Sequence, residues 1–275
     1  MKLISVNDLS LQDNGYFAFK HVAFSLSQNE IIGINGDNGS GKTTLLEAIA
    51  NHQAPDSGEI EYTPGVRIGY MPQVNPQVID QSVLKYLESI RRLSKDLAVR
   101  PEQMQGMITF LGMSPYLDQP VRQLSVGLQR RVDFLAAVVG HPNVLLLDEP
   151  FIFQTTKTVK SMLSLIQDLK DNGSGVVIAG THFDEMINHY LDNGYFLKDN
   201  RLEKIASTTN KEVKVELIFS VHPNSVAVTS DIERYITSNL NNVVTLTLPV
   251  SLKNAMVEKM TRLNYQLEGE KRSEN

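Results

Sequence analysis

The stretch that most constrains the fold of this chain is GDNGSGKTT, Gly36 to Thr44, which fits the pattern G-x-x-x-x-G-K-[ST]. It follows the apolar run EIIGIN and precedes the helical pattern LLEAIAN. Glycines let such a loop turn its N–H groups inward around a phosphate chain, and the positive end of the following helix points at the same place. The order of strand, loop and helix therefore predicts a nucleotide phosphate site, against the alternative of a chance glycine turn.

The residue types in this loop have separate expected roles. The three glycines shape the backbone, Lys42 can bridge the β- and γ-phosphates, and the Thr43 hydroxyl can ligate magnesium. The predicted binding residues of the loop are Gly36, Asp37, Asn38, Gly39, Ser40, Gly41, Lys42, Thr43 and Thr44.

A second chemical signal is VLLLDEP, residues 144–150, in which a buried apolar run ends in two acids. Asp148 at the tip of the strand can hold magnesium through water, and Glu149 can orient an attacking water as a general base. An ordinary strand that ends in an acidic turn is the alternative, and the preceding phosphate loop argues against it.

The chain alternates apolar strand runs with helical patterns, which is typical of an α/β core. Helical spacing covers residues 80–119 and 126–139, and another helix separates the buried runs NVLLLDEP and GVVIAGTH. The polar stretch 206–212 predicts a linker. Beyond it, alternation at 213–221 and 244–248 and helical spacing at 232–240 and 252–263 predict a small βαβα unit.

Composition limits the possible partners and location. The formal net charge is −5, which argues against a nucleic-acid partner, and the chain has no cysteine, so thiolate chemistry is excluded. The apolar runs are far shorter than the roughly 20 residues that span a bilayer. We expect a cytoplasmic protein that reaches the inner face of the cell membrane only through another chain.

The stretch QLSVGLQRR, residues 123–131, supplies a second helix end suited to phosphate. Ser125 is a good N-cap, and Ser125 and Gly127 leave a hydroxyl and N–H groups at the start of the next helix. Two such ends in one chain make sense if one serves a neighbour's nucleotide. With these motifs the chain resembles the nucleotide-binding subunit of ABC transporters, in which two subunits pair head to tail and each signature sequence closes the other's phosphate loop around ATP.

The resemblance implies a fold and further site residues. The implied fold is an α/β P-loop NTPase core over residues 1–206, with antiparallel β and helical subdomains (the latter about 75–140), followed by a small α+β domain at 212–275. Gln73, in GYMPQ, falls at the position of the Q-loop glutamine, which senses magnesium and the attacking water. His182 falls at the switch histidine, which contacts the γ-phosphate, and Tyr16 is a candidate to stack on adenine.

The chain also departs from the family's pattern. The usual signature is L-S-G-G-Q, but Val126 replaces its first glycine and Leu128 its glutamine. The usual S-x-L-D after the acidic pair is absent, and FIFQTT, residues 151–156, stands there instead. Hydrolysis stays plausible because the candidate catalytic residues Glu149, His182 and Gln73 are present.

The function predicted is therefore a Mg-ATP-hydrolysing subunit that pairs with a second ATP-binding subunit and powers a separate membrane permease. The stretch SVLKYLESIRRL, residues 82–93, the apolar residue at 128 and the C-terminal appendage favour an exporter, although an importer stays open. The alternative is a regulatory ATP-binding subunit with weak hydrolysis, which pairs with a different ATPase subunit.

Overall fold

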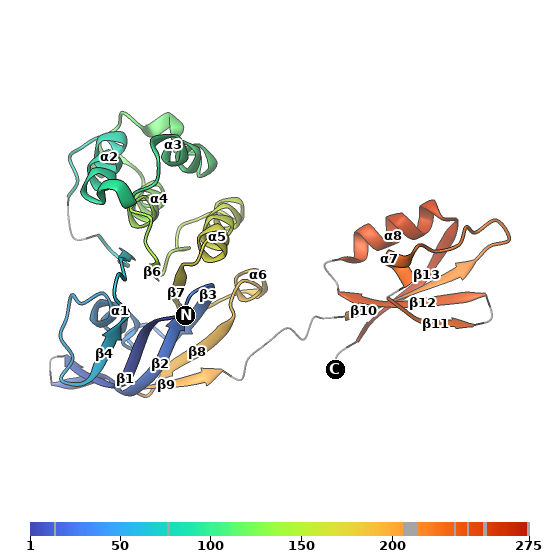
Figure 1. The fold of residues 1–275 in the computed structure, drawn as a ribbon, viewed down its shortest axis with the longest axis horizontal. Helices are drawn as coiled ribbons and strands as arrows, with labels where there is room; N and C mark the ends of the chain where they lie inside the picture. Colours follow the sequence, from blue (N-terminus) through green and yellow to red (C-terminus); the bar gives the residue numbers. More distant parts are fainter. Residues whose placement is uncertain are drawn as a thin grey trace. The chain divides into compact units, whose positions relative to one another are not determined.

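The computed structural model of the chain describes residues 1–13, 15–75, 78–205, 214–233, 235–240, 242–249 and 252–273. It divides into two compact units, Met1–Ser207 and Thr208–Asn275 (Figure 1). The predicted linker at 206–212, together with Val213, lies outside the described residues. Within the described ranges, no helix combines the length and the apolar character needed to cross a membrane.

A six-stranded sheet forms the centre of the first unit, in the order β5-β6-β7-β3-β8-β9. The first five of these strands are parallel, and β9 runs antiparallel to β8. Their bounds are β3 Glu30–Asn35, β5 Ile68–Met71, β6 Val144–Asp148, β7 Gly175–Gly180, β8 Asn193–Lys198 and β9 Arg201–Ile205. The α/β core predicted from the alternating pattern is confirmed.

The central strands of this sheet are buried on both faces, which explains their unbroken apolar runs. In β6, Leu145 and Leu147 face one apolar core, whereas Val144 and Leu146 face another. Because side chains alternate along a strand, the two cores lie on opposite faces of the sheet.

One of these cores is closed by an antiparallel sheet of order β2-β1-β4 and by the helix that follows the phosphate loop. The bounds are β1 Lys2–Asp13, β2 Tyr16–Ser27, β4 Ser57–Tyr62 and α1 Lys42–Ile49. The antiparallel subdomain implied by the sequence is therefore present.

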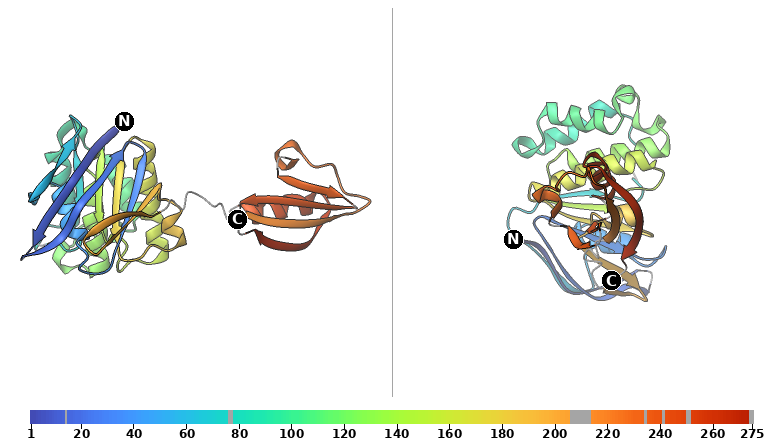
Figure 2. Two further views of the ribbon diagram at one scale, coloured as in Figure 1. Left: turned by 90° about the horizontal axis from the view of Figure 1, so that it is seen from below. Right: turned by 90° about the vertical axis from the view of Figure 1, so that its right-hand side faces the viewer.

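Helices close the other core. They are α2 Val83–Leu93, α3 Pro101–Phe110, α4 Val126–Val138, α5 Thr156–Asp171 and the short α6 Glu185–Asn188. The group α2, α3 and α4 lies on the far side of the unit from the blue antiparallel strands in Figure 1 and in the right-hand view of Figure 2. The helical spacing at 80–119 corresponds to α2 and α3, and the spacing at 126–139 corresponds to α4.

The elements of the second unit follow in the order strand, helix, strand, strand, helix, strand. They are β10 Lys214–Val221, α7 Ser230–Glu233, β11 Ile236–Leu240, β12 Val243–Pro249, α8 Lys253–Arg262 and β13 Tyr265–Ser273. Its sheet has the order β11-β12-β10-β13, and every pairing is antiparallel. This βαββαβ topology is that of the ferredoxin-like fold. The helices α7 and α8 cover one face of the sheet (Figure 1).

The predicted βαβα pattern of this unit is partly wrong. The helix expected at 232–240 is a four-residue helix followed by β11, and β13 was not predicted. Ile236 pairs with Leu246 of β12, so a sheet partner distant in sequence overrides the helical spacing.

Candidate functional site

The loop between β3 and α1 has the shape that a phosphate site requires. Gly39 and Gly41 have φ values of 78° and 100°, which glycine adopts without steric strain. A Cβ on Gly41 would lie 2.5 Å from the Ala18 carbonyl oxygen, so β2 packs directly against the loop. The predicted glycine turn and the helix start at Lys42 are therefore both present.

Lys42 is buried at the centre of this loop. Its Nζ donates hydrogen bonds to the carbonyl oxygens of Gly36 at 2.6 Å and Asp37 at 3.0 Å, and lies 3.8 Å from Glu149 Oε1. The ammonium group is held inside the turn, so a phosphate chain bound there would contact both this cation and the N–H groups of the loop.

The end of β6 brings two carboxylates to the same place. Asp148 Oδ2 accepts a 2.6 Å hydrogen bond from Thr43 Oγ1, and Asp148 Oδ1 is buried without a hydrogen-bond partner among the described residues. A hydroxyl beside a carboxylate with a free oxygen is a donor set that magnesium prefers. Thr43 and Asp148 therefore fit the predicted metal site, and burial raises the pKa of Asp148.

Glu149 sits in a strained backbone conformation, with φ at 48°. Its N–H donates to the Ala179 carbonyl oxygen at 2.9 Å, and its carboxylate accepts from the backbone of Thr181. Burial raises the pKa of Glu149, while the neighbouring Lys42 opposes the rise. A carboxylate with a raised pKa beside a phosphate loop is suited to act as a general base.

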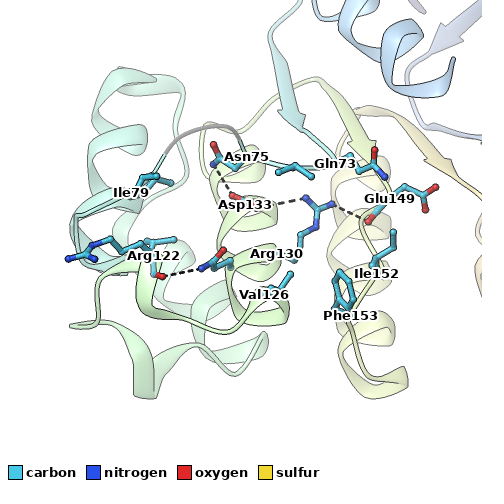
Figure 3. A pocket seen from close by; sticks show the side chains of 14 residues that line it. Gln73, Asn75, Ile79, Arg122, Val126, Arg130, Asp133, Glu149, Ile152 and Phe153 are labelled. Carbon is cyan, nitrogen blue, oxygen red and sulfur yellow. Dashed lines mark hydrogen bonds and ion pairs between the residues drawn. The ribbon is translucent and has the colours of Figure 1, made fainter. Parts of the chain in front are cut away.

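Three predicted residues lie around this centre with exposed side chains. His182 directly follows Thr181, whose backbone bonds the Glu149 carboxylate, so the fold brings it close to the acidic pair although the two are distant in sequence. Gln73 follows β5 and lines a pocket together with Glu149 (Figure 3). Tyr16 begins β2 and is 81% exposed, two residues before the Ala18 carbonyl that touches the loop.

The signature residues lie at the start of α4, where they contact the loop that follows β6. Ser125 is the N-cap, and its Oγ accepts from the Leu128 N–H at 3.4 Å. A Cβ on Gly127 would lie 2.7 Å from the Phe153 carbonyl oxygen, so the loop after β6 packs closely on this helix start. The neighbouring Val126 is exposed on a pocket of about 680 Å³ that also contains Gln73 and Glu149 (Figure 3).

Sequence reasoning missed Arg130, a buried cation behind the acidic pair. Its guanidinium donates to the carbonyl oxygens of Pro72, Asp148 and Glu149. Burial lowers its pKa, and the nearby carboxylates oppose this. The only signal in the sequence was an Arg and an Asp three residues apart, Arg130 and Asp133, within an otherwise apolar helix face.

Comparison with known proteins decides the family. The family model described as ABC transporter matches residues 19–152. An uncharacterized ABC transporter ATP-binding protein of Methanocaldococcus jannaschii is 28% identical over 202 residues, which cover 72% of this chain and 75% of that protein. The zinc import ATP-binding protein ZnuC of Paracoccus denitrificans is 31% identical over 183 residues, or 66% of this chain and 70% of that protein.

The chain belongs to the ABC transporter family. It is an ATP-binding subunit and an ATPase of this family. The fold agrees, because a dimeric ATP-binding cassette solved in a post-hydrolysis state with ADP and Pi superimposes with a TM-score of 0.63 at 22% identity. That match covers 74% of this chain and all of the other, and it shows the fold. The family match and the curated relatives confirm the resemblance stated from the sequence.

Proposed function

We propose that two ATP-binding subunits of this kind pair head to tail around two Mg-ATP molecules. The observation that carries the proposal is the convergence of Lys42, Thr43, Asp148 and Glu149 at one loop, while Ser125 and Gly127 form a second helix start that packs on the loop after β6. A second helix end suited to phosphate, in addition to the one at the phosphate loop, is explained if it serves the partner's nucleotide.

The residues divide the work of hydrolysis between them. Lys42 and the loop N–H groups hold the β- and γ-phosphates, and Tyr16 stacks on adenine. Glu149 accepts a proton from the attacking water, Gln73 orients that water, and His182 contacts the γ-phosphate. Magnesium held by Thr43, Asp148 and Gln73 would neutralise charge on the phosphates when bound. The deciding experiment is nucleotide hydrolysis by Glu149→Gln, which should fall while ATP binding persists.

The pocket beside Gln73 supports coupling to a separate membrane permease. It is lined by exposed apolar side chains, Val74, Val78, Val126 and Phe153, and by the catalytic Glu149. An amphipathic permease helix would bury such a surface. The subunit would then be peripheral on the inner face of the cell membrane. Purification with associated membrane protein, followed by identification of that partner, tests this step.

The direction of transport is supported differently by two observations. The pattern of 82–93, which contains the whole of α2, favours an exporter. Likeness to a zinc import ATP-binding protein favours an importer. We keep export as the proposal, and substrate flux in vesicles that contain the identified permease tests it.

A second candidate is a regulatory subunit that closes on ATP but hydrolyses weakly. It is favoured by Phe153, which stands in place of the S-x-L-D loop, is 71% exposed and has a φ of 60°. An altered loop at this position would change the coupling between the two ATP sites of the proposed dimer. The steady-state rate of the isolated subunit, compared with that of a mixture with its partner subunit, separates the two candidates.

A further inference from the structure

Arg130 joins three parts of the ATPase unit through one buried side chain. The residue is 5% exposed and belongs to α4. Its Nη1 donates to the Pro72 carbonyl oxygen at 2.5 Å, and its Nη2 donates to the Asp148 carbonyl oxygen at 2.7 Å. Nη2 also donates to the Glu149 carbonyl oxygen at 3.1 Å (Figure 3). Because a guanidinium is a rigid planar fork, these bonds fix the carbonyl groups relative to the helix.

A second contact ties the segment around Gln73 to the same helix. Arg130 lies 3.8 Å from Asp133, one turn further along α4, and Asp133 accepts a 3.0 Å hydrogen bond from Asn75 Nδ2. Pro72 and Asn75 are thus held on either side of Gln73. The position of this glutamine is set by α4 through a buried ion pair.

The contact with Glu149 has a particular consequence, because that residue has a φ of 48°. A left-handed conformation in a residue other than glycine costs on the order of 1–3 kcal/mol and persists only where surrounding contacts enforce it. The Glu149 carbonyl oxygen accepts from Arg130 at 3.1 Å and from the Ile152 N–H at 3.4 Å, and the Glu149 N–H donates to Ala179. Loss of the guanidinium would remove the shorter of the two bonds to this carbonyl and loosen the backbone that aims the carboxylate at the phosphate loop.

We propose that Arg130 is a positioning residue for ATP hydrolysis. Arg130 joins Glu149, the proposed base, and the turn that carries Gln73 to α4. The start of the same helix bears Ser125 and Gly127, which are proposed to contact the nucleotide of the partner subunit. When α4 docks on that nucleotide, it therefore also fixes the position of Glu149 in its own subunit. This rests on the proposed roles of Glu149 and Gln73.

The test compares three variants with the full-length wild-type chain. Arg130→Met keeps the length of the side chain but leaves Asp133 as an unpaired buried charge, which is destabilising in its own right. The double variant Arg130→Met with Asp133→Asn removes that charge and keeps an acceptor for Asn75. Arg67→Met is the matched control. Arg67 Nη2 also donates a hydrogen bond to a backbone carbonyl oxygen, that of His141 at 2.9 Å, but at the end of β6 opposite to Asp148.

We expect kcat of the double variant to fall roughly 100-fold, the size typical of a small misplacement of a catalytic group, with ATP Kd and KM nearly unchanged. The control should hydrolyse ATP like the wild type. In a Glu149→Gln background the double variant should lower single-turnover hydrolysis no further, because residues that act as a unit are not additive.

Two results would overturn the proposal. One is a double variant that melts like the wild type and regains its kcat, which would make Arg130 a purely structural cation. The other is a rate loss that multiplies with that of Glu149→Gln. Undiminished hydrolysis by Glu149→Gln alone would instead overturn the proposed base, so the two failures are distinguishable.

Discussion

Thr43 Oγ1 donates a 2.6 Å hydrogen bond to Asp148 Oδ2 and so joins the phosphate loop to the end of β6 across 105 residues of sequence. The other oxygen of the same carboxylate is buried and lacks a partner in the described part of the chain. This pair is where the predicted metal site can be tested most directly.

Thr43→Val removes the hydroxyl and keeps the shape of the side chain. We expect the magnesium concentration that supports half-maximal hydrolysis to rise roughly 10- to 100-fold, the range found when a group that supports a metal site is lost. A magnesium titration of ATPase activity measures this. Thr109→Val, on the exposed face of α3, is the control. An unchanged titration for Thr43→Val would contradict the metal assignment.

Glu149→Gln keeps the volume of the side chain but removes the base. Turnover should fall by about 10² to 10⁴, the usual contribution of a general base, while ATP still binds. The variant should also trap an ATP-bound dimer. Steady-state phosphate release measures the rate, and size-exclusion chromatography with ATP detects the dimer. Hydrolysis at the wild-type rate would exclude the assigned role.

Lys42→Ala removes the ammonium group that lies inside the phosphate loop. A charge-assisted hydrogen bond contributes about 1.5–3 kcal/mol, so ATP affinity should fall roughly 10- to 100-fold. Calorimetric titration of ATP measures the change, and Lys157→Ala, an exposed lysine at the start of α5, controls for net charge. Equal affinities for the two variants would mean that the loop is not the binding site.

Gly127→Ala tests the signature end of α4. Its Cβ would lie 2.7 Å from the Phe153 carbonyl oxygen, so the loop after β6 must move. Hydrolysis should fall, whereas ATP binding by the monomer should stay unchanged, because Gly127 belongs to the helix start that is proposed to serve the partner's nucleotide. Gly106→Ala in α3 is the control, since no atom lies within 4 Å of the added carbon. Loss of monomer affinity in Gly127→Ala would contradict the shared-site proposal.

A chain that ends near Ile205 tests the independence of the second unit. We expect it to fold and to bind ATP, because the apolar cores of the two units consist of separate residues. Melting temperature and ATP affinity, each compared with the full chain, are the measurements. A shortened chain that is insoluble, or that does not bind ATP, would show that the domain boundary is wrong.

Local pattern was sufficient for the elements that carry the phosphate chemistry. The glycine spacing of residues 36–41, the apolar run before Asp148 and the N-cap at Ser125 each depend on neighbours within a few residues. Strand, turn and helix propensities act over that distance, so these elements could be predicted and are present. At residues 236–240 the spacing of apolar residues predicted a helix, but these residues form a strand because they pair with β12.

The sequence by itself determined the glycine loop, the acidic strand end and the capped start of α4. Only the tertiary structure decided that Arg130 binds the carbonyl groups beside Gln73 and Glu149. It also placed Phe153 against Gly127. These contacts depend on which strands lie side by side, and strand order is settled by burial of apolar faces across the whole sheet, which no short stretch of sequence encodes.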